Sequence, residues 1–243
     1  MIGAPLAGLL AAAGAGGPQI EYVGGATGAT GGRTSTWTIS LTSLTGGVAS
    51  APAAGDFVVV FYAVGTSNET SALALSVTGY TQQALLFSND AYEANLLVAT
   101  KLLTGADTSI TLSQTYNAAY AGAATVHVFR NVNPTTPLDV AVQTVTQINT
   151  ALANPPSITP ATPGAWVVAG GGAGRQTGSA TFTSSDLTAF LSAGQNDFRS
   201  VTAGAGYVAD ASSTVDPAQF GLTQADSANF AAAAVTLALR PAP

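Results

Sequence analysis

The stretch FVVVFY at residues 57–62 decides the fold class of this chain. It is a continuous run of β-branched and aromatic side chains, the residue types that are enriched in strands. A run without polar alternation predicts a strand that is covered on both faces or lies at the centre of a sheet. Upstream, Trp37, Ile39 and Leu41 alternate with polar residues, which predicts a half-buried strand.

The same strand patterns continue to the end of the chain and predict an all-β, jelly-roll-like antiparallel β-sandwich. Clusters of Gly, Pro and Asn separate the runs, notably at Gly46-Gly47 and over residues 131–137, 154–163 and 170–174. Further strands are expected at Leu73–Val77, Gln83–Phe87, Ala94–Leu103, Ser109–Leu112, Ala123–Arg130, Val140–Val145, Ala165–Ala169, Thr188–Ser192, Arg199–Val208, Gln219–Thr223 and Ala231–Leu239.

The composition excludes several classes of function. Of 243 residues, only 6 are basic and 12 acidic, so the net charge is −6 and charged residues make up 7% of the chain. Six scattered cations cannot neutralise a row of phosphates, which argues against a nucleic-acid-binding patch. The absence of cysteine excludes disulfides and Cys-ligated metals. No apolar stretch is long enough to predict a membrane-spanning helix.

The first 32 residues predict an apolar arm followed by a linker. No Lys or Arg precedes Arg33, so a secretion signal is not expected. The arm residues with roughly helical spacing, which we expect to mediate assembly, are Ile2, Leu6, Leu9 and Leu10. Such an arm must dock on its own domain, on a neighbouring subunit or on a larger assembly. Gly24–Gly32 is expected to be a flexible linker, which places the sandwich domain at residues 33–243.

An internal repeat is predicted at an offset of about 109 residues. Gly55–Val60 recurs as Gly164–Ala169, and Gly122–Arg130 recurs as Ala231–Arg240 at an offset of 109 or 110. Between them, residues 95–102 match residues 201–208. The two halves would span about 50–145 and 160–243. Such a long period fits two interleaved sets of strands in one sandwich, or two small sandwiches.

Residues 126–139 read VHVFRNVNPTTPLD and carry a resemblance to a known family. The segment resembles the "aYRGVdpttPlD" signature of a family of β-sandwich proteins from tailed bacteriophages, prophages and bacteria. Asn131 and Asn133 stand where that signature has Gly and Asp, and Asn tolerates the left-handed turn that Gly favours. The resemblance implies a jelly-roll-like sandwich and a virion component, and it implies no catalytic residues.

The same segment predicts a structural corner formed by Arg130, Asn131, Pro134, Pro137 and Asp139. The two prolines fix their own φ and push the preceding residues toward extended geometry, so the chain leaves one strand and crosses an edge to the next. Arg130 and Asp139 flank the loop, and we expect them to pair across it.

Candidates for chemistry are few, so we expect no enzyme, cofactor or metal. His127 is the only histidine and is expected to be half-buried or at an interface. Three glutamates, Glu21, Glu69 and Glu93, offer little for a pair of catalytic carboxylates. The acidic loops 89–93 and 210–216 lack the alternate spacing of calcium loops. The glycines at 170–174 lack a Lys-Ser/Thr ending and predict a hairpin or a bulge.

These observations predict a structural virion protein of a tailed bacteriophage: a capsid decoration or cement protein, a head fibre or a tail-associated component. We expect it to form a homo-oligomer, for which a trimer is one option, and to contact other virion proteins. Its site of action would be the virion, assembled in the host cytoplasm. The alternative is a glycan-binding adhesin or lectin-like module for bacterial surfaces, with exposed aromatics as a stacking platform.

Overall fold

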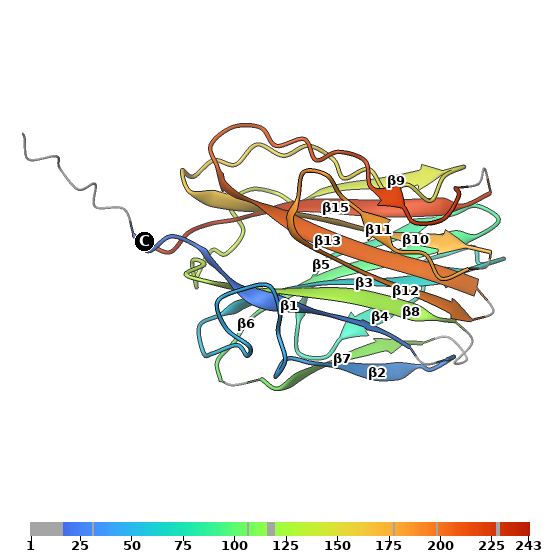
Figure 1. Ribbon diagram of the computed structural model, residues 1–243, viewed down its shortest axis with the longest axis horizontal. Helices are drawn as coiled ribbons and strands as arrows, with labels where there is room; N and C mark the ends of the chain where they lie inside the picture. The colour runs from blue at the N-terminus through green and yellow to red at the C-terminus, as the bar shows by residue number, and fades with distance from the viewer. Residues whose placement is uncertain are drawn as a thin grey trace, which may run out of the picture.

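The computed structural model describes residues 17–30, 32–105, 107–115, 120–176, 178–197, 199–226 and 229–243 (Figure 1). Every regular element in these residues is a β-strand, which confirms the all-β prediction. The strands of the first half are β1 (Glu21–Ala29), β2 (Thr36–Ser40), β3 (Phe57–Thr66), β4 (Leu75–Val77), β5 (Thr81–Ser88), β6 (Glu93–Leu102), β7 (Ser109–Gln114) and β8 (Gly122–Arg130). Those of the second half are β9 (Gln143–Ile148), β10 (Ala165–Arg175), β11 (Phe182–Thr183), β12 (Thr188–Asp197), β13 (Arg199–Ala211), β14 (Gly221–Leu222) and β15 (Ala231–Leu239).

The first eight strands form a jelly roll. β1 pairs antiparallel with β8, β2 with β7 and β3 with β6. The first strand thus pairs with the last, the second with the seventh and the third with the sixth. This pattern results when a long hairpin is rolled into two sheets. The products are a first sheet in the order β1-β8-β3-β6-β5 and an outer sheet in the order β2-β7-β4.

The remaining strands repeat this arrangement as a second jelly roll. β9 pairs with β15, β10 with β13 and β11 with β14. The second sheet, β12-β13-β10-β15-β9, has the strand order of the first sheet once equivalent strands are matched. The counterpart of β2 is reduced to a bridge between Ile158 and Val215. The internal duplication is therefore confirmed in strand order, and the halves form two small sandwiches rather than interleaved strands.

The two jelly rolls pack through their five-stranded sheets. The largest apolar cluster lies between these sheets and contains Phe61 of β3, Val98 of β6, Val168 of β10 and Leu237 of β15. A second cluster lies between the first sheet and the outer sheet, which Figure 1 shows as a separate layer. Since each large sheet is covered on both faces, β3 and β10 are buried along their whole length. This layering explains the continuous apolar run at residues 57–62.

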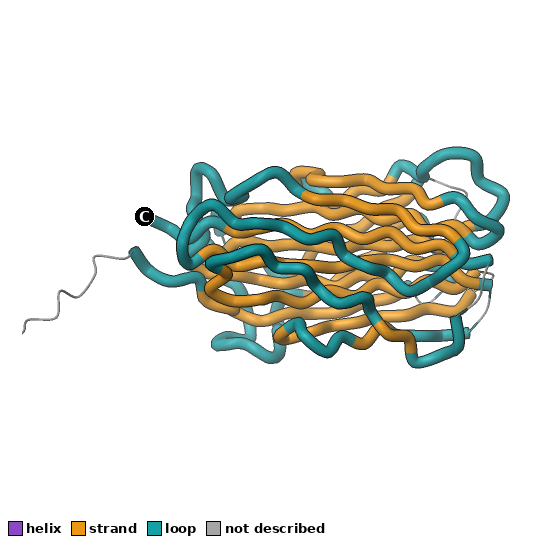
Figure 2. Tube along the Cα trace, turned by 90° about the horizontal axis from the view of Figure 1, so that it is seen from above, coloured by secondary structure: helices purple, strands orange, loops and turns teal. Residues whose placement is uncertain are grey.

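A pseudo-two-fold relation connects the two jelly rolls. β9 is the counterpart of β1, and β12 is the counterpart of β5. β1 lies against β12, and in the same way β9 lies against β5. The strands run along the long axis, and Figure 2 shows loops at its two ends as well as long loops that run lengthwise over the face turned to the viewer. In matched registers, Phe57 stands opposite Phe129 and Trp166 stands opposite Leu239. The offset is 109 from Phe57 to Trp166 and 110 from Phe129 to Leu239, as the sequence predicts for the outer parts of the repeat.

Two equivalent glycines mark the closest approach of the sheets. A β-carbon on Gly65 would overlap with the carbonyl oxygen of Ser200, and one on Gly174 would overlap with that of Glu93. Gly65 stands opposite Ala94 and Gly174 opposite Val201, so β6 and β13 match at an offset of 107. The match of residues 95–102 with 201–208 is therefore wrong by one residue.

The glycines at 170–174 do not form a hairpin or a bulge, so that prediction is wrong. They lie inside β10, which continues to Arg175. A β-carbon on Gly170 would lie 2.5 Å from the ring of Phe61, and one on Gly172 would lie 2.6 Å from the β-carbon of Ala63. Here glycine makes room for side chains of the opposite sheet.

The prediction of a flexible linker at Gly24–Gly32 is wrong for the residues that form β1. This strand pairs with β8 from Glu21 to Ala29, so the sandwich begins well before Arg33. Gly24 has a φ of 150° at a register shift, where a β-carbon would lie 2.9 Å from that of Leu44. The glycine therefore serves a bulge and a close contact rather than flexibility.

Candidate functional site

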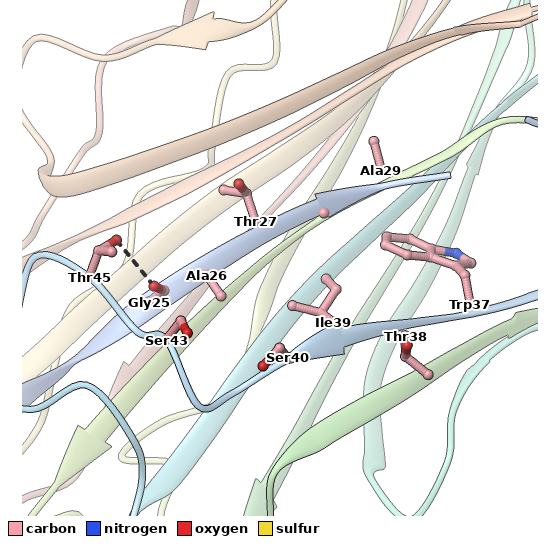
Figure 3. A pocket seen from close by; sticks show the side chains of 11 residues that line it. Gly25, Ala26, Thr27, Ala29, Trp37, Thr38, Ile39, Ser40, Ser43 and Thr45 are labelled. Atoms are coloured by element: carbon pink, nitrogen blue, oxygen red, sulfur yellow. Dashed lines mark hydrogen bonds between the residues drawn. The ribbon is translucent and has the colours of Figure 1, made fainter. Parts of the chain in front are cut away.

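An open groove of about 380 Å³ lies between β1 and β2 (Figure 3). β1 is the edge strand of the first sheet and β2 is the edge strand of the outer sheet, so the two free edges border one opening. The groove is lined by Gly25, Ala26, Thr27, Gly28 and Ala29 of β1, by Trp37, Thr38, Ile39 and Ser40 of β2, and by Ser43 and Thr45 of the following loop.

The outer edge of β1 is closed at one end and open at the other. Gly25 exchanges two backbone hydrogen bonds of 2.9 Å with Thr45, on the side away from β8. Backbone direction alternates along a strand, so Thr27 and Ala29 point their N–H and C=O groups to that same side. Thr30, of opposite parity, donates its N–H to the carbonyl of Gly122 at the start of β8. Thr27 and Ala29 therefore present backbone groups to the groove.

The free edge of β2 follows from the same alternation. Gln114 of β7 donates its N–H to the carbonyl of Ser35, and Leu41 donates to the carbonyl of Thr108. The odd-numbered residues thus bond to β7, which turns the backbone groups of Thr38 and Ser40 to the open side. Two strand edges with unused pairing capacity face the groove, and such edges are templates for pairing with another segment.

The floor of the groove is apolar. Figure 3 shows the side chains of Trp37 and Ile39 projecting from β2 toward β1. A β-carbon on Gly28 would lie 2.7 Å from atoms of both residues, so only glycine lets β1 cross over them. The Trp37 ring packs edge-to-face on Tyr62, with ring centroids 5.9 Å apart. The floor is therefore fixed by packing on the first sheet.

The groove carries no charged side chain among its 11 lining residues. Basic side chains of the chain are engaged elsewhere. Lys101 pairs with Asp107 at 2.6 Å, and Arg33 lies 3.7 Å from Asp197. Arg175 donates to the carbonyl of Ala225 at 2.9 Å. The groove is thus a polar but uncharged surface, which costs little to desolvate compared with ionised groups.

The predicted assembly arm, Ile2, Leu6, Leu9 and Leu10, lies outside the described residues. The predicted corner residues Arg130, Asn131, Pro134, Pro137 and Asp139 are all described. Asn131 has a φ of 61°, the left-handed geometry for which the signature uses Gly. The Asn133 side chain accepts N–H groups of Thr135 and Thr136, each at 3.0 Å.

The predicted ion pair between Arg130 and Asp139 is wrong. Arg130 donates to both carboxylate oxygens of Asp56, at 2.9 and 3.0 Å. Asp139 instead accepts from Arg240 at 3.1 Å. The reason is the sheet register, which places the end of β8 beside the start of β3 and the end of β15 beside the connection after β8.

These two ion pairs lie at similar places in the two jelly rolls, and Arg240 matches Arg130 at an offset of 110. The carboxylates do not match, because Asp139 lies in the connection after β8 and the residue that matches Asp56 at an offset of 109 is Ala165. In each jelly roll, an arginine at the end of the last strand binds a buried carboxylate that also accepts backbone N–H groups before the central strand. Asp56 accepts from Ala53 at 2.8 Å, whereas Asp139 accepts from Thr162 at 3.0 Å. Burial raises the pKa of Asp139, but hydrogen bonds from Thr162, Ala161 and Arg240 outweigh it and lower the pKa overall.

His127 is fully buried between the two large sheets, not half-buried. Its Nδ1 lies 3.3 Å from the Tyr22 hydroxyl, and its ring stacks on Phe129 at 6.4 Å between centroids. Burial lowers its pKa to about 4. The imidazole is therefore neutral at pH 7, and its contacts are those of a core residue.

A buried carboxylate that the sequence did not reveal lies at the end of the molecule where β3 ends and β6 begins. Glu93 accepts from the Thr66 hydroxyl at 2.5 Å and from the backbone N–H of Glu69 at 2.7 Å. Burial raises its pKa, and these hydrogen bonds offset only part of the effect. The Glu69 carboxylate accepts from Tyr120 at 2.9 Å. The two carboxylates serve to hold the loop after β3.

The described residues contain no cluster of three or more His, Cys, Asp or Glu side chains able to hold a metal ion. Asp90 instead accepts the backbone N–H of Asn149 at 2.7 Å, which is a loop-closing contact. Within the same residues, no helix is long and apolar enough to cross a membrane.

Comparison of the chain with protein-family models, with curated proteins and with solved structures found no match.

Proposed function

We propose that the protein is a structural component of a tailed-bacteriophage particle, acting by protein–protein assembly as a decoration, head-fibre or tail-associated subunit. The observation that carries the proposal is the groove between β1 and β2. It combines two strand edges with free pairing capacity, an apolar floor and no charge. Exposed strand edges are positions where chains add to one another, and natural proteins usually block them with charge or proline.

The side chains beside these edges favour assembly. Thr36, Thr38 and Ser40 of β2 are exposed hydroxyl residues, and Thr27 is exposed on β1. Lysine or glutamate at these positions would oppose strand addition, whereas hydroxyls can be buried against a neighbour at small cost. The resemblance of residues 126–139 to a phage-associated signature supports the same class of function.

The test is mass spectrometry of particles purified from the phage or induced prophage that encodes the chain. We expect peptides from residues 33–243 at a stoichiometry of many copies per particle, and their loss in particles from a deletion strain. Complementation with the wild-type chain should restore them. Particles that band and infect normally, and that contain no peptide of this chain, would overturn the proposal.

The groove also supports a second candidate, binding of glycans on bacterial surfaces. Trp37 lines the groove together with the hydroxyl residues Thr27, Thr38, Ser40 and Ser43, and an aromatic ring beside a polar surface is a common sugar platform. A glycan array with the full chain tests this function. Binding that is lost in Trp37→Leu and retained in Trp166→Phe would favour it, and no binding by the wild-type oligomer would exclude it.

A further inference from the structure

The groove between β1 and β2 matches an extended segment of this same protein. We infer that it receives part of residues 1–16 of a second copy, added as a β-strand beside Thr27 and Ala29 of β1 or Thr38 and Ser40 of β2. This inference rests on the proposed assembly function and names the partner for it. An added strand gains main-chain hydrogen bonds from the edge and specificity from alternate side chains.

The backbone groups define how the added strand would bind. Thr27 and Ala29 are two residues apart, which is the repeat of hydrogen-bonded positions along an antiparallel edge. The pairing between Gly25 and Thr45 already uses this edge at one end. The added strand would therefore continue, beyond Gly25, a ladder that the chain's own loop begins.

The pattern of residues 1–16 fits the apolar floor. In an extended conformation, even-numbered residues share one face. That face carries Ile2, Leu6 and Leu10, with the small residues Ala4 and Gly8 between them. The alternation of large and small side chains suits a floor formed by Trp37 and Ile39. Neither residues 1–16 nor the lining of the groove contains a charged side chain.

The geometry of the chain favours exchange between copies over self-docking. Gly17 lies beside Ala242 and Pro243, four residues before the start of β1, and it is not part of the lining of the groove. Ten residues of extended chain separate Gly17 from Thr27, a span of about 30 Å. The seven residues from Leu10 to Gly17 reach at most about 25 Å, so Leu10 cannot lie beside Thr27 of its own copy. Leu6, eleven residues from Gly17, reaches up to about 40 Å, so only exchange places the whole stretch from Ile2 to Leu10 beside Thr27. A neighbouring copy has no such limit.

Reciprocal exchange of arms between two copies gives an isologous dimer, whereas an arm that passes to a third copy makes a heterologous contact. Heterologous contacts close into rings when the rotation permits and otherwise extend as filaments. A closed ring is consistent with a homo-oligomer on a symmetric particle site.

Cysteine cross-linking between two differently tagged full-length chains tests the inference. The chain has no native cysteine, so only engineered pairs can react. We expect Leu6→Cys in one chain to form a disulfide with Ala26→Cys or Ser43→Cys in the other, because Ala26 packs on the same apolar cluster as Trp37 and Ile39 and Ser43 lines the groove. The matched control is Ser213→Cys, an exposed serine on the second jelly roll. At least one groove position should react about tenfold faster than the control.

Two results would overturn the inference. One is a set of groove cysteines that react no faster than Ser213→Cys. The other is a purely intramolecular disulfide in a chain that carries both Leu6→Cys and Ser43→Cys. Light scattering provides the second measurement. Leu6→Asp should reduce the solution mass toward 23.9 kDa, whereas Leu9→Asp, on the opposite face, should not. An equal effect of the two variants would contradict the strand register.

The outcome is separable from that of the proposed function. A protein that is present in particles but shows no groove cross-link leaves the assembly role intact and removes only this docking mode. Cross-linking in solution with no copies in particles confirms the docking mode and removes the virion role.

Discussion

At the scale of single residues, Gly65 and Gly174 set how closely the two large sheets approach. Each faces a backbone carbonyl of the opposite jelly roll, Ser200 for one and Glu93 for the other. A backbone atom cannot move aside as a flexible side chain does, so a methyl group must push the sheets apart. Because the same contact occurs in both halves, this close packing of the sheets belongs to the internal repeat.

Gly65→Ala and Gly174→Ala should each lower the free energy of unfolding by about 1–3 kcal/mol, the usual cost of overpacking. Gly105→Ala is the matched control, since no atom lies within 4 Å of the position that its β-carbon would take. It should change stability by less than about 0.5 kcal/mol. Urea denaturation followed by tryptophan fluorescence measures all three. Equal stability of Gly174→Ala and Gly105→Ala would contradict the close approach.

The Glu93 carboxylate predicts a pH dependence with a defined sign. Burial raises its pKa in the folded state above the 4.5 of an ordinary glutamate. The folded state therefore holds the proton more tightly than the unfolded state. The contribution of the protonated Glu93 side chain to the free energy of unfolding is fully present below about pH 4.5 and is lost as the pH rises through the folded pKa.

Glu93→Gln should remove this pH dependence, because the amide still accepts from the Glu69 N–H and bonds to Thr66 without carrying charge. At pH 8 the variant should unfold at a urea concentration at least as high as that of the wild type. Glu21→Gln, which changes a half-exposed carboxylate, is the control, and its urea midpoint should depend on pH as that of the wild type does. If the urea midpoints of the wild type and of Glu93→Gln change in parallel between about pH 4 and 8, Glu93 is not the source of the pH dependence.

At the scale of elements, strands with strong side-chain patterns were predictable and glycine-rich strands were not. Residues 57–62 and 231–239 are predicted as strands and form β3 and β15. The segment GGATGA in β1 has the composition of a linker, because local sequence does not show the loop that packs over it. The glycines of β10 could not be interpreted locally for the same reason, since Phe61 and Ala63 of another sheet explain them.

The connection between the jelly rolls is held by Asp139. Its side chain is fully buried and accepts from Arg240 and from the N–H groups of Ala161 and Thr162. Asp139→Ala should lower the free energy of unfolding by about 2–4 kcal/mol, because the donors lose a charged acceptor. Asp216→Ala, at an exposed position, should be nearly neutral. Equal denaturation midpoints for the two variants would refute this role.

At the scale of the whole molecule, the chain is an internal dimer of jelly rolls with one shared core. The sequence predicts the duplication from Gly55–Val60 and its recurrence, but not how the halves pack. The pairing of Arg130 with Asp56 and of Arg240 with Asp139 could not be predicted, because proximity along the chain favours Arg130 with Asp139. The groove was also beyond prediction, since the composition of β1 indicates a linker.

The shared core predicts cooperative unfolding of the two jelly rolls. The chain has two tryptophans, Trp37 in the first jelly roll and Trp166 in the second. Trp166→Phe and Trp37→Phe therefore yield proteins in which the remaining tryptophan reports on one half. Each variant should show the same midpoint by its fluorescence and by circular dichroism of the whole chain. Fluorescence and circular dichroism midpoints that differ within one variant would show that the halves unfold separately.

The proposed function requires the protein to assemble through the open edges of β1 and β2. Amide hydrogen exchange of the full chain, dilute and assembled, measures those edges directly. We predict that the amides of Thr27, Ala29, Thr38 or Ser40 exchange about tenfold more slowly, or slower still, in the assembled protein, while exposed amides near Ser213 do not change. Unchanged exchange along both edges in a protein that has demonstrably assembled would contradict the claim.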